Sequence, residues 1–158
     1  MKKINFLIKL CKEGKLQEIE PNDEVCKAYL QRSNESLSSA KALSKIGNLK
    51  DAVALAYYSM YHCLLAALFK VGIKCENHAA AIILLKEVFE MDNSHILKAK
   101  SERVDKQYYV DFKVNKEETE TSIRIAEEFV AEINTLIAKL NEKDIKDYHK
   151  KAVMLYIE

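Results

Sequence analysis

The chain has 158 residues, a formal net charge of +1, three Gly and one Pro. This length fits one domain with a substantial hydrophobic core, and the balanced charge excludes a protein that coats nucleic acid through a uniformly basic surface. Scarce Gly and Pro with abundant Lys, Glu, Leu and Ala predict an all-α fold. The four cysteines are widely spaced and no signal-peptide pattern precedes them, so we expect reduced thiols in a cytoplasmic protein.

Residues 1–22 are predicted to form a basic arm outside the main domain. Segment 4–13 has apolar residues at helical spacing and ends at Gly14, and a connector with Pro21 follows. Five lysines against a single glutamate among residues 1–15 leave two interpretations open. Either the arm contacts an RNA backbone or an acidic partner, or it is a flexible terminus that keeps the protein soluble.

The main domain opens with two helices that the spacing predicts to be antiparallel. The first covers residues 23–46 and ends at Gly47, a residue suited to a left-handed C-cap. The next helix covers residues 49–71. Because the connection between them has only two residues, we expect a helical hairpin.

The second of these helices is apolar on all sides. Between residues 52 and 69, only Ser59 and His62 lack an apolar or aromatic side chain, so the helix needs to be covered from several directions. Its apolar stretch is long enough to span a bilayer. However, its Ala and Tyr content, His62 and the charged residues at both ends favour a buried helix in a soluble protein, and no membrane association is expected.

Two shorter helices are predicted from their start signals. Asn77 is the expected N-cap of a helix over residues 79–91, and Ser94 is the expected N-cap of a more polar helix over residues 95–108. The second of them ends in an aromatic cluster that consists of Tyr108, Tyr109 and Phe112.

A long helix and a short one complete the chain. Asn115 with Glu118 three residues later predicts a capping box, which opens a long amphipathic helix to about residue 140. The tail, residues 144–157, has the pattern of a further amphipathic helix.

The predicted architecture is an up-and-down antiparallel helical bundle. Four to five main helices make up this bundle over residues 23–141. Short helical extensions are expected on either side of it, at residues 1–22 and 142–158.

Three stretches of the sequence resemble a known family. Ala-Tyr-Tyr-Ser-Met-Tyr-His at 56–62, followed by Leu-Phe-Lys-Val-Gly-Ile at 68–73 and then His78, resembles the signature of HEPN domains, specifically a small stand-alone prokaryotic subfamily. Residues 103–112 resemble the Arg-x-x-Ala-Asp-Tyr stretch of that subfamily, with Gln107 where the pattern has Asp. The similarity extends over about residues 23–140, from the first long helix to the last long helix.

The resemblance implies a function as well as a fold. HEPN bundles usually pair into dimers and carry an Arg-x4–6-His motif at the junction of the second and third bundle helices. In active members this motif serves metal-independent RNA cleavage, and many members are toxins encoded beside a minimal nucleotidyltransferase antitoxin. The expected partners are therefore a second copy of the chain, a nucleotidyltransferase-type antitoxin, and RNA or a nucleotide, without any cofactor.

His78 occupies the position of the motif histidine, but none of Val71, Gly72 and Ile73 supplies the motif arginine. RNA cleavage needs a base for the ribose 2′-OH, an acid for the leaving 5′ oxygen and a cation for the phosphorane. Histidine suits the first two tasks, and two His78 side chains that meet across a dimer would divide them. Lys74 is the nearest cation, although it lacks the planar two-pronged grip of Arg on phosphate.

The candidate site residues follow from this comparison. The catalytic candidates are His78 and Lys74. The candidates for substrate binding are Arg103, Tyr57, Tyr61 and Asn77. A zinc site built from His62, Cys63, Cys75 and His78 is not predicted, because adjacent helical residues point about 100° apart and a structural site needs four converging ligands.

Each candidate also has a structural interpretation. A histidine in a first helical turn is commonly solvated or paired with a carboxylate such as that of Glu76, and Lys74 is typical of a surface lysine. Arg103 could form an ion pair with a neighbouring acid instead of contacting phosphate. Tyr57 and Tyr61 could line a pocket or stack on bases, or they could be core or interface residues with the hydroxyl at the edge. Two functions therefore stay open: a metal-independent endoribonuclease toxin, or a non-catalytic dimeric module that binds a partner or a nucleotide.

Overall fold

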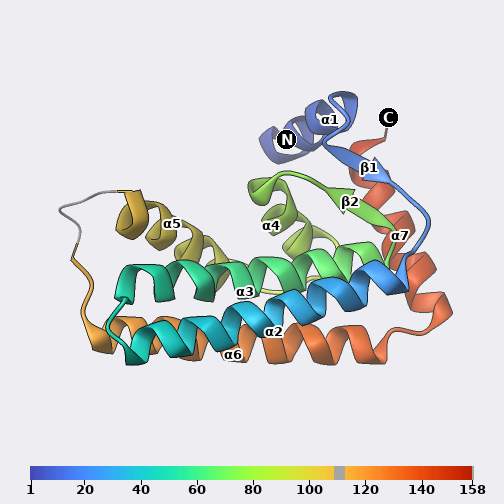
Figure 1. Ribbon diagram of the computed structural model, residues 1–158. Helices are drawn as coiled ribbons and strands as arrows, with labels where there is room; N and C mark the ends of the chain where they lie inside the picture. The colour runs from blue at the N-terminus through green and yellow to red at the C-terminus, as the bar shows by residue number, and fades with distance from the viewer. Residues whose placement is uncertain (109–112, 158) are drawn as a thin grey trace.

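The computed structural model describes residues 1–108 and 113–157, with the backbone alone for 104–108. Within these ranges the fold consists of seven helices and a two-stranded sheet (Figure 1). The elements, in chain order, are α1 (Lys2–Lys12), β1 (Leu16–Glu18), α2 (Asp23–Lys45), α3 (Leu49–Lys70), β2 (Ile73–Cys75), α4 (His78–Glu87), α5 (Ser94–Tyr108), α6 (Lys116–Lys139) and α7 (Glu142–Tyr156). The all-α prediction is confirmed. The side chains of the predicted aromatic cluster, Tyr108, Tyr109 and Phe112, and that of Gln107 lie outside the described residues.

Three long helices, α2, α3 and α6, lie side by side and form the body of the bundle (Figure 1). The side chain of Asn22 caps α2 by accepting a hydrogen bond from the backbone N of Val25 at 3.0 Å. Gly47 has a φ of +86°, which is the predicted left-handed conformation, and α3 folds back antiparallel to α2. Helix α5 packs on α3 (Figure 1), and its Glu102 side chain reaches Ser122 of α6 at 3.4 Å.

Helix α3 is the centre of the core. Among the described helices it alone has the length and composition of a membrane span, and 78% of that apolar stretch is buried inside the protein. Its surroundings are α2, α5, α6 and α4, so one chain covers the all-round apolar surface without a second copy. The buried positions are Ala52, Val53, Ala54, Ala56, Tyr57, Ser59, Met60, Tyr61, Cys63, Leu64, Leu65, Ala66, Ala67 and Leu68.

A small antiparallel sheet joins the N-terminal arm to the bundle and was not predicted. Strand β1 pairs with β2 so that Leu16 lies opposite Cys75 and Glu18 lies opposite Ile73. Strands of three residues are too short to show the alternating pattern that identifies a strand in sequence. Because Leu7 is only 1% exposed, the arm is part of the hydrophobic core, and the interpretation as a flexible terminus is wrong.

Asparagine side chains cap the last two helices, α6 and α7. The side chain of Asn115 accepts from the backbone N of Glu118 at 2.8 Å, as predicted. Ser94 is the first residue of α5 and not its cap: its backbone N and hydroxyl donate to Asp92, at 3.0 and 2.8 Å. A complete capping box between Asn141 and Asp144 opens α7, which contacts α1.

Candidate functional site

The first residue of α4 is His78, which follows directly after β2 and the half-buried Asn77. Asn77 acts as the N-cap, because its side chain accepts a hydrogen bond from the backbone N of Ala80 at 3.0 Å. The helix start and its cap therefore fix the backbone of His78. The geometry gives Asn77 a structural role, while its predicted role in substrate binding stays a prediction.

Two tyrosines of α3 orient the ring of His78. Its Nδ1 lies 2.7 Å from the hydroxyl of Tyr57, and its ring stacks on that of Tyr61 with a centroid distance of 3.8 Å and an interplanar angle of 22°. The exposed fractions of Tyr57 and Tyr61 are 0% and 7%, so both rings are anchored in the core. Nε2 of His78 makes no hydrogen bond with the described residues, and the carboxylate of Glu76, one alternative partner considered for His78, pairs with Lys74 instead.

Arg103 approaches the same tyrosines from α5. Its Nη1 donates to the hydroxyl of Tyr58 at 3.1 Å, and its guanidinium carbon lies 5.4 and 5.5 Å from the ring centroids of Tyr57 and Tyr58. These distances are typical of cation–π contacts. We call the group formed by Tyr57, Tyr58, Tyr61, His78 and Arg103 the His78 cluster. It brings together four of the predicted site residues, namely His78, Arg103, Tyr57 and Tyr61.

Lys74 belongs to β2 and has a different neighbour. Its Nζ forms an ion pair with Glu76 at 3.4 Å, and no described contact joins it to His78. The two cations that act on His78 are Arg103 and Lys100, both from α5. The contribution of Lys74 to catalysis stays a prediction, and Arg103 is the cation that the fold places beside the histidine.

Burial and the neighbouring charges determine which groups of the cluster are protonated. The pKa of His78 is lowered, first by burial and then by the positive charges of Arg103 and Lys100. Burial is also the largest cause of the raised pKa values of the Tyr57 and Tyr61 hydroxyls. At neutral pH the imidazole of His78 is therefore uncharged and can accept a proton, while the Tyr57 hydroxyl keeps its hydrogen.

The hydroxyl of Tyr57 supports His78 in both protonation states. A hydroxyl both donates and accepts hydrogen bonds, so it accepts from Nδ1–H when Nε2 is the base. The same bond persists after Nε2 has gained a proton, because both ring nitrogens are then donors. The 2.7 Å contact thus fits a histidine that works as a base and, once protonated, as an acid.

The position of the missing motif arginine is occupied by other parts of the chain. Val71 and Ile73 are 0% exposed. Gly72 has a φ of +83°, and a Cβ there would lie 2.6 Å from Nδ1 of His149 and 2.6 Å from the carbonyl O of Ile19. The junction between α3 and β2 therefore has no room for a long cationic side chain.

His149, on α7, seals this junction and was missed in the sequence. Its Nδ1 lies 2.8 Å from the carbonyl O of Val71, and its Nε2 lies 2.7 Å from Oε1 of Glu18. These contacts span 78 and 131 positions of the chain. No local motif marks such a contact, because its partners are a backbone carbonyl and a carboxylate of a strand that was itself not predicted.

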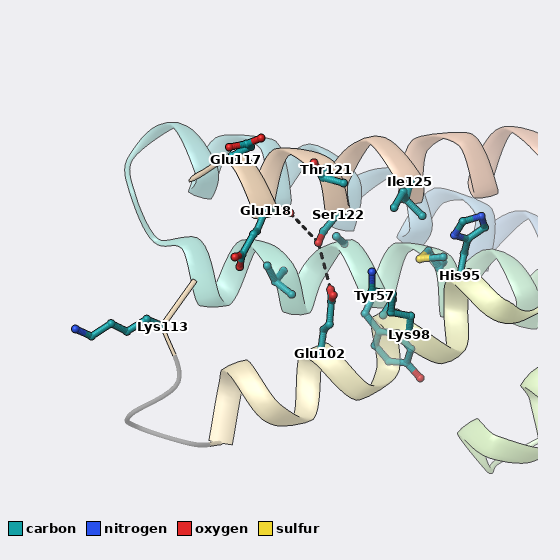
Figure 2. A pocket seen from close by; sticks show the side chains of 14 residues that line it. Tyr57, His95, Lys98, Glu102, Lys113, Glu117, Glu118, Thr121, Ser122 and Ile125 are labelled. Carbon is teal, nitrogen blue, oxygen red and sulfur yellow. Dashed lines mark hydrogen bonds between the residues drawn. The ribbon is translucent and has the colours of Figure 1, made fainter. Parts of the chain in front are cut away.

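A cavity of about 600 Å³ lies between α3, α5 and α6, on the other side of Tyr57 (Figure 2). Its lining includes Val53 and Met60 of α3, together with Lys98 and Glu102 of α5, Glu117 and Glu118 of α6, and Lys113 just before α6. The hydroxyl of Ser122 has two acceptors for its single hydrogen, the backbone O of Glu118 at 3.0 Å and a carboxylate oxygen of Glu102 at 3.4 Å (Figure 2). The sequence did not indicate this cavity, because α5 and α6 are brought together by tertiary packing alone. Among the described residues, no group of three or more His, Cys, Asp or Glu could hold a metal ion.

Comparisons with known proteins match the part of the chain that holds this site. A model of the HEPN domain matches residues 26–136, a region that contains the whole His78 cluster. A protein of Methanocaldococcus jannaschii named "Putative toxin MJ0605" is 29% identical over 124 residues, which are 74% of this chain and 92% of that protein. The UPF0332 protein PH1297 of Pyrococcus horikoshii is 37% identical over 59 residues, which are 37% of this chain and 42% of that protein. The resemblance noted in the sequence is confirmed, and the chain belongs to the HEPN family.

Proposed function

We propose that the protein is a toxin-type HEPN ribonuclease that cleaves RNA without a metal ion, with His78 as general base and acid. The observation that carries the proposal is the His78 cluster: a buried tyrosine holds an uncharged imidazole, and the guanidinium of Arg103 contacts the same tyrosine. The name of the M. jannaschii relative supports a toxin. A nucleotidyltransferase-type antitoxin is the partner that we propose with it.

The proposed reaction uses the 2′-OH of the RNA as the nucleophile. Nε2 of His78 takes the proton of this hydroxyl, and the 2′ oxygen attacks the neighbouring phosphorus. The guanidinium of Arg103 stabilises the additional negative charge on the phosphorane. The bond from phosphorus to the 5′ oxygen then breaks, and this oxygen takes a proton. The products are a 2′,3′-cyclic phosphate and a free 5′-hydroxyl.

We further propose that the protein acts as a homodimer in which two His78 side chains share one RNA groove. One imidazole then serves as base while the protonated imidazole of the second copy serves as acid. Since most of the apolar surface of α3 is already covered within one chain, the dimer contact has to use the surface of the bundle that stays exposed. A stable pair should bury about 1,000 Å² or more in total.

The direct test is cleavage of a labelled single-stranded RNA in the presence of EDTA. We expect the wild-type protein to cleave it and His78→Ala to lose the activity, because no other described group replaces Nε2. His95→Ala is a matched control, since His95 also stands at the start of a helix but lies outside the His78 cluster. Expression of the wild-type protein and of His95→Ala should arrest growth, whereas expression of His78→Ala should not. Equal RNA cleavage by wild type and His78→Ala would reject the proposal.

The second candidate function is a non-catalytic dimeric module that binds a partner protein or a nucleotide. The sealed junction favours it, because Val71, Gly72 and Ile73 leave no place for the motif arginine of active family members. For this candidate, light scattering should give a dimer and the RNA assay should give no cleavage by either wild type or His78→Ala.

A further inference from the structure

Four aromatic rings form a row that leads to the His78 cluster from the opposite end of α3. The ring centroids of Phe69 and Tyr29 are 5.5 Å apart, those of Tyr29 and His62 are 6.0 Å apart, and those of His62 and Tyr58 are 5.9 Å apart. The interplanar angles along the row are 15°, 33° and 24°. Tyr58 then meets His78 edge to face, with a centroid distance of 6.5 Å. We call Phe69, Tyr29, His62 and Tyr58 the aromatic row.

The aromatic row lies at the surface of the bundle and not in its core. Each of its four rings is half-buried, whereas most positions of α3 are fully buried. Tyr58 and His62 are four residues apart on α3, and Phe69 follows seven residues later, so the three side chains share one helical face. From Tyr58 to Phe69 the row covers about 16 Å along the helix axis. The four aromatic rings of the row are thus partly exposed to solvent, whereas most of α3 is buried.

The charges beside the row are positive. Arg32 stands one helical turn after Tyr29 on α2, and its charge lowers the pKa of His62. Arg103 contacts Tyr58 at the other end. Burial is the largest cause of the lowered pKa of His62, at about 4, so its ring is uncharged at neutral pH and stacks as an aromatic. Lys70, next to Phe69 in the chain, forms an ion pair with Asp23 of α2.

We propose that the aromatic row binds unpaired nucleobases of an RNA strand whose phosphates contact Arg32 and Arg103, so that the strand is guided to His78. This inference rests on the proposed function and adds the residues that hold the substrate. Aromatic side chains within a positively charged groove are the general means by which proteins bind single strands, because every base has a flat face that stacks. In a duplex those faces are covered by neighbouring bases, so the row selects single-stranded RNA.

The test measures binding apart from cleavage, in the His78→Ala background, where RNA stays intact. The probe is an eight-nucleotide single-stranded RNA that carries fluorescein at one end and 2-aminopurine at a central position. Anisotropy reports binding, and quenching of 2-aminopurine reports stacking on a protein ring. We expect Tyr29→Leu and His62→Leu each to weaken binding about tenfold, since stacking is worth about 1–3 kcal/mol per base.

Matched controls separate stacking from damage to the fold. Tyr29→Phe and His62→Phe keep an aromatic ring and should bind within twofold of the parent protein, with the quenching retained. Tyr148→Leu removes a half-buried tyrosine that packs on Phe89, away from the row, and should not change binding. A duplex of the same sequence should bind weakly and show no quenching.

The outcomes distinguish this inference from the proposed function. Unchanged binding by both Leu variants, or equal binding of the duplex, would overturn the inference even if the wild-type protein cleaves RNA. If the Leu variants instead turn a dimer into a monomer in sedimentation and leave RNA binding unchanged, the row is a contact between subunits and the inference fails. Binding that depends on the row, without any cleavage by the wild-type protein, would support the inference and reject the nuclease.

Discussion

His149 and His78 lie near the two ends of strand β2, and they make different hydrogen bonds. His78 uses one ring nitrogen to contact Tyr57 and receives no hydrogen bond at Nε2 from the described residues. His149 uses both nitrogens, one toward the carbonyl of Val71 and one toward Glu18. A histidine with both nitrogens engaged holds elements together, whereas one with an open nitrogen can exchange a proton with a substrate. Hydrogen bonding, and not residue type, thus distinguishes His149, which joins two elements, from His78, which has an available nitrogen.

The two regions also explain where the cation of the site comes from. At the sealed junction, α7 and the segment after β1 occupy the space that a motif arginine would need. At the His78 cluster, α5 places Arg103 against Tyr57 and Tyr58 instead. The positive charge beside the histidine is thus supplied from a later helix, and the two regions can be perturbed independently.

The largest expected effect is on stability, from Gly72→Ala at the sealed junction. The new Cβ would stand 2.6 Å from both His149 and the backbone O of Ile19, on a residue with φ +83°. Backbone strain and overpacking together should lower the free energy of unfolding by about 3 kcal/mol. Gly47→Ala is the matched control, because Gly47 has φ +86° but nothing within 4 Å, so only strain of about 1 kcal/mol remains. Urea unfolding measures both, and equal losses would show that α7 does not seal the junction.

The next effect is on activity, from Arg103→Ala in the His78 cluster. Removing the cation should lower kcat/KM for RNA cleavage about 100-fold, as for other groups that stabilise developing charge. It should also move the acid limb of the pH profile to higher pH, because Arg103 helps to keep the pKa of His78 low. Lys74→Ala tests the competing cation and should change kcat/KM by about twofold or less, since Lys74 pairs with Glu76. A larger loss of kcat/KM in Lys74→Ala than in Arg103→Ala would show that Lys74 is the cation that supports cleavage.

The sequence predicts the helices well because their signals are local. Gly47, Asn77 and Asn115 each mark a boundary through the conformation or cap that one residue provides, and all three do so in the structure. The contacts that define the site are not local. The approach of Arg103 to Tyr58 joins residues 45 positions apart, and it depends on how α5 packs against α3. The β1–β2 pair has too few residues for a recognisable strand pattern. The family resemblance identified His78 as a candidate residue, but it could not show which side chains surround it.

A smaller effect on stability is expected from His149→Ala. The change leaves the carbonyl of buried Val71 without its partner and removes the contact with Glu18, which should cost about 2 kcal/mol. The loss should be local, so amide exchange in α7 and β1 should become faster while the centres of α2 and α3 stay protected. His149→Gln, which can keep one of the two contacts, should lie between the variant and wild type. Equally faster amide exchange in all helices would contradict a local stabilising role of His149.

The smallest effect is the pH dependence that His62 contributes to stability. Its pKa is about 4 in the folded protein against an ordinary value of 6.5, because burial and the charge of Arg32 disfavour the charged ring. Between these values the unfolded chain binds more protons than the folded one, so the free energy of unfolding falls as pH falls from about 6.5 to about 4. Half-exposure of the ring reduces the size of this contribution.

His62→Phe isolates this contribution because it keeps an aromatic ring in the row but cannot take up a proton. The pKa of His78 is also lowered, so part of the acid sensitivity remains in the variant. The carboxyl pKa of Asp23 is lowered by its hydrogen bonds with Lys70 and Lys27, and this adds a loss of stability at still lower pH in both proteins. The relevant quantity is therefore the difference between wild type and His62→Phe, measured by urea unfolding at about pH 7 and about pH 5. We expect the variant to lose less stability than wild type over this interval. Equal losses of stability in the two proteins would show that the ring of His62 is as well solvated in the folded protein as in the unfolded chain. His62 would then not be a half-buried ring of the aromatic row.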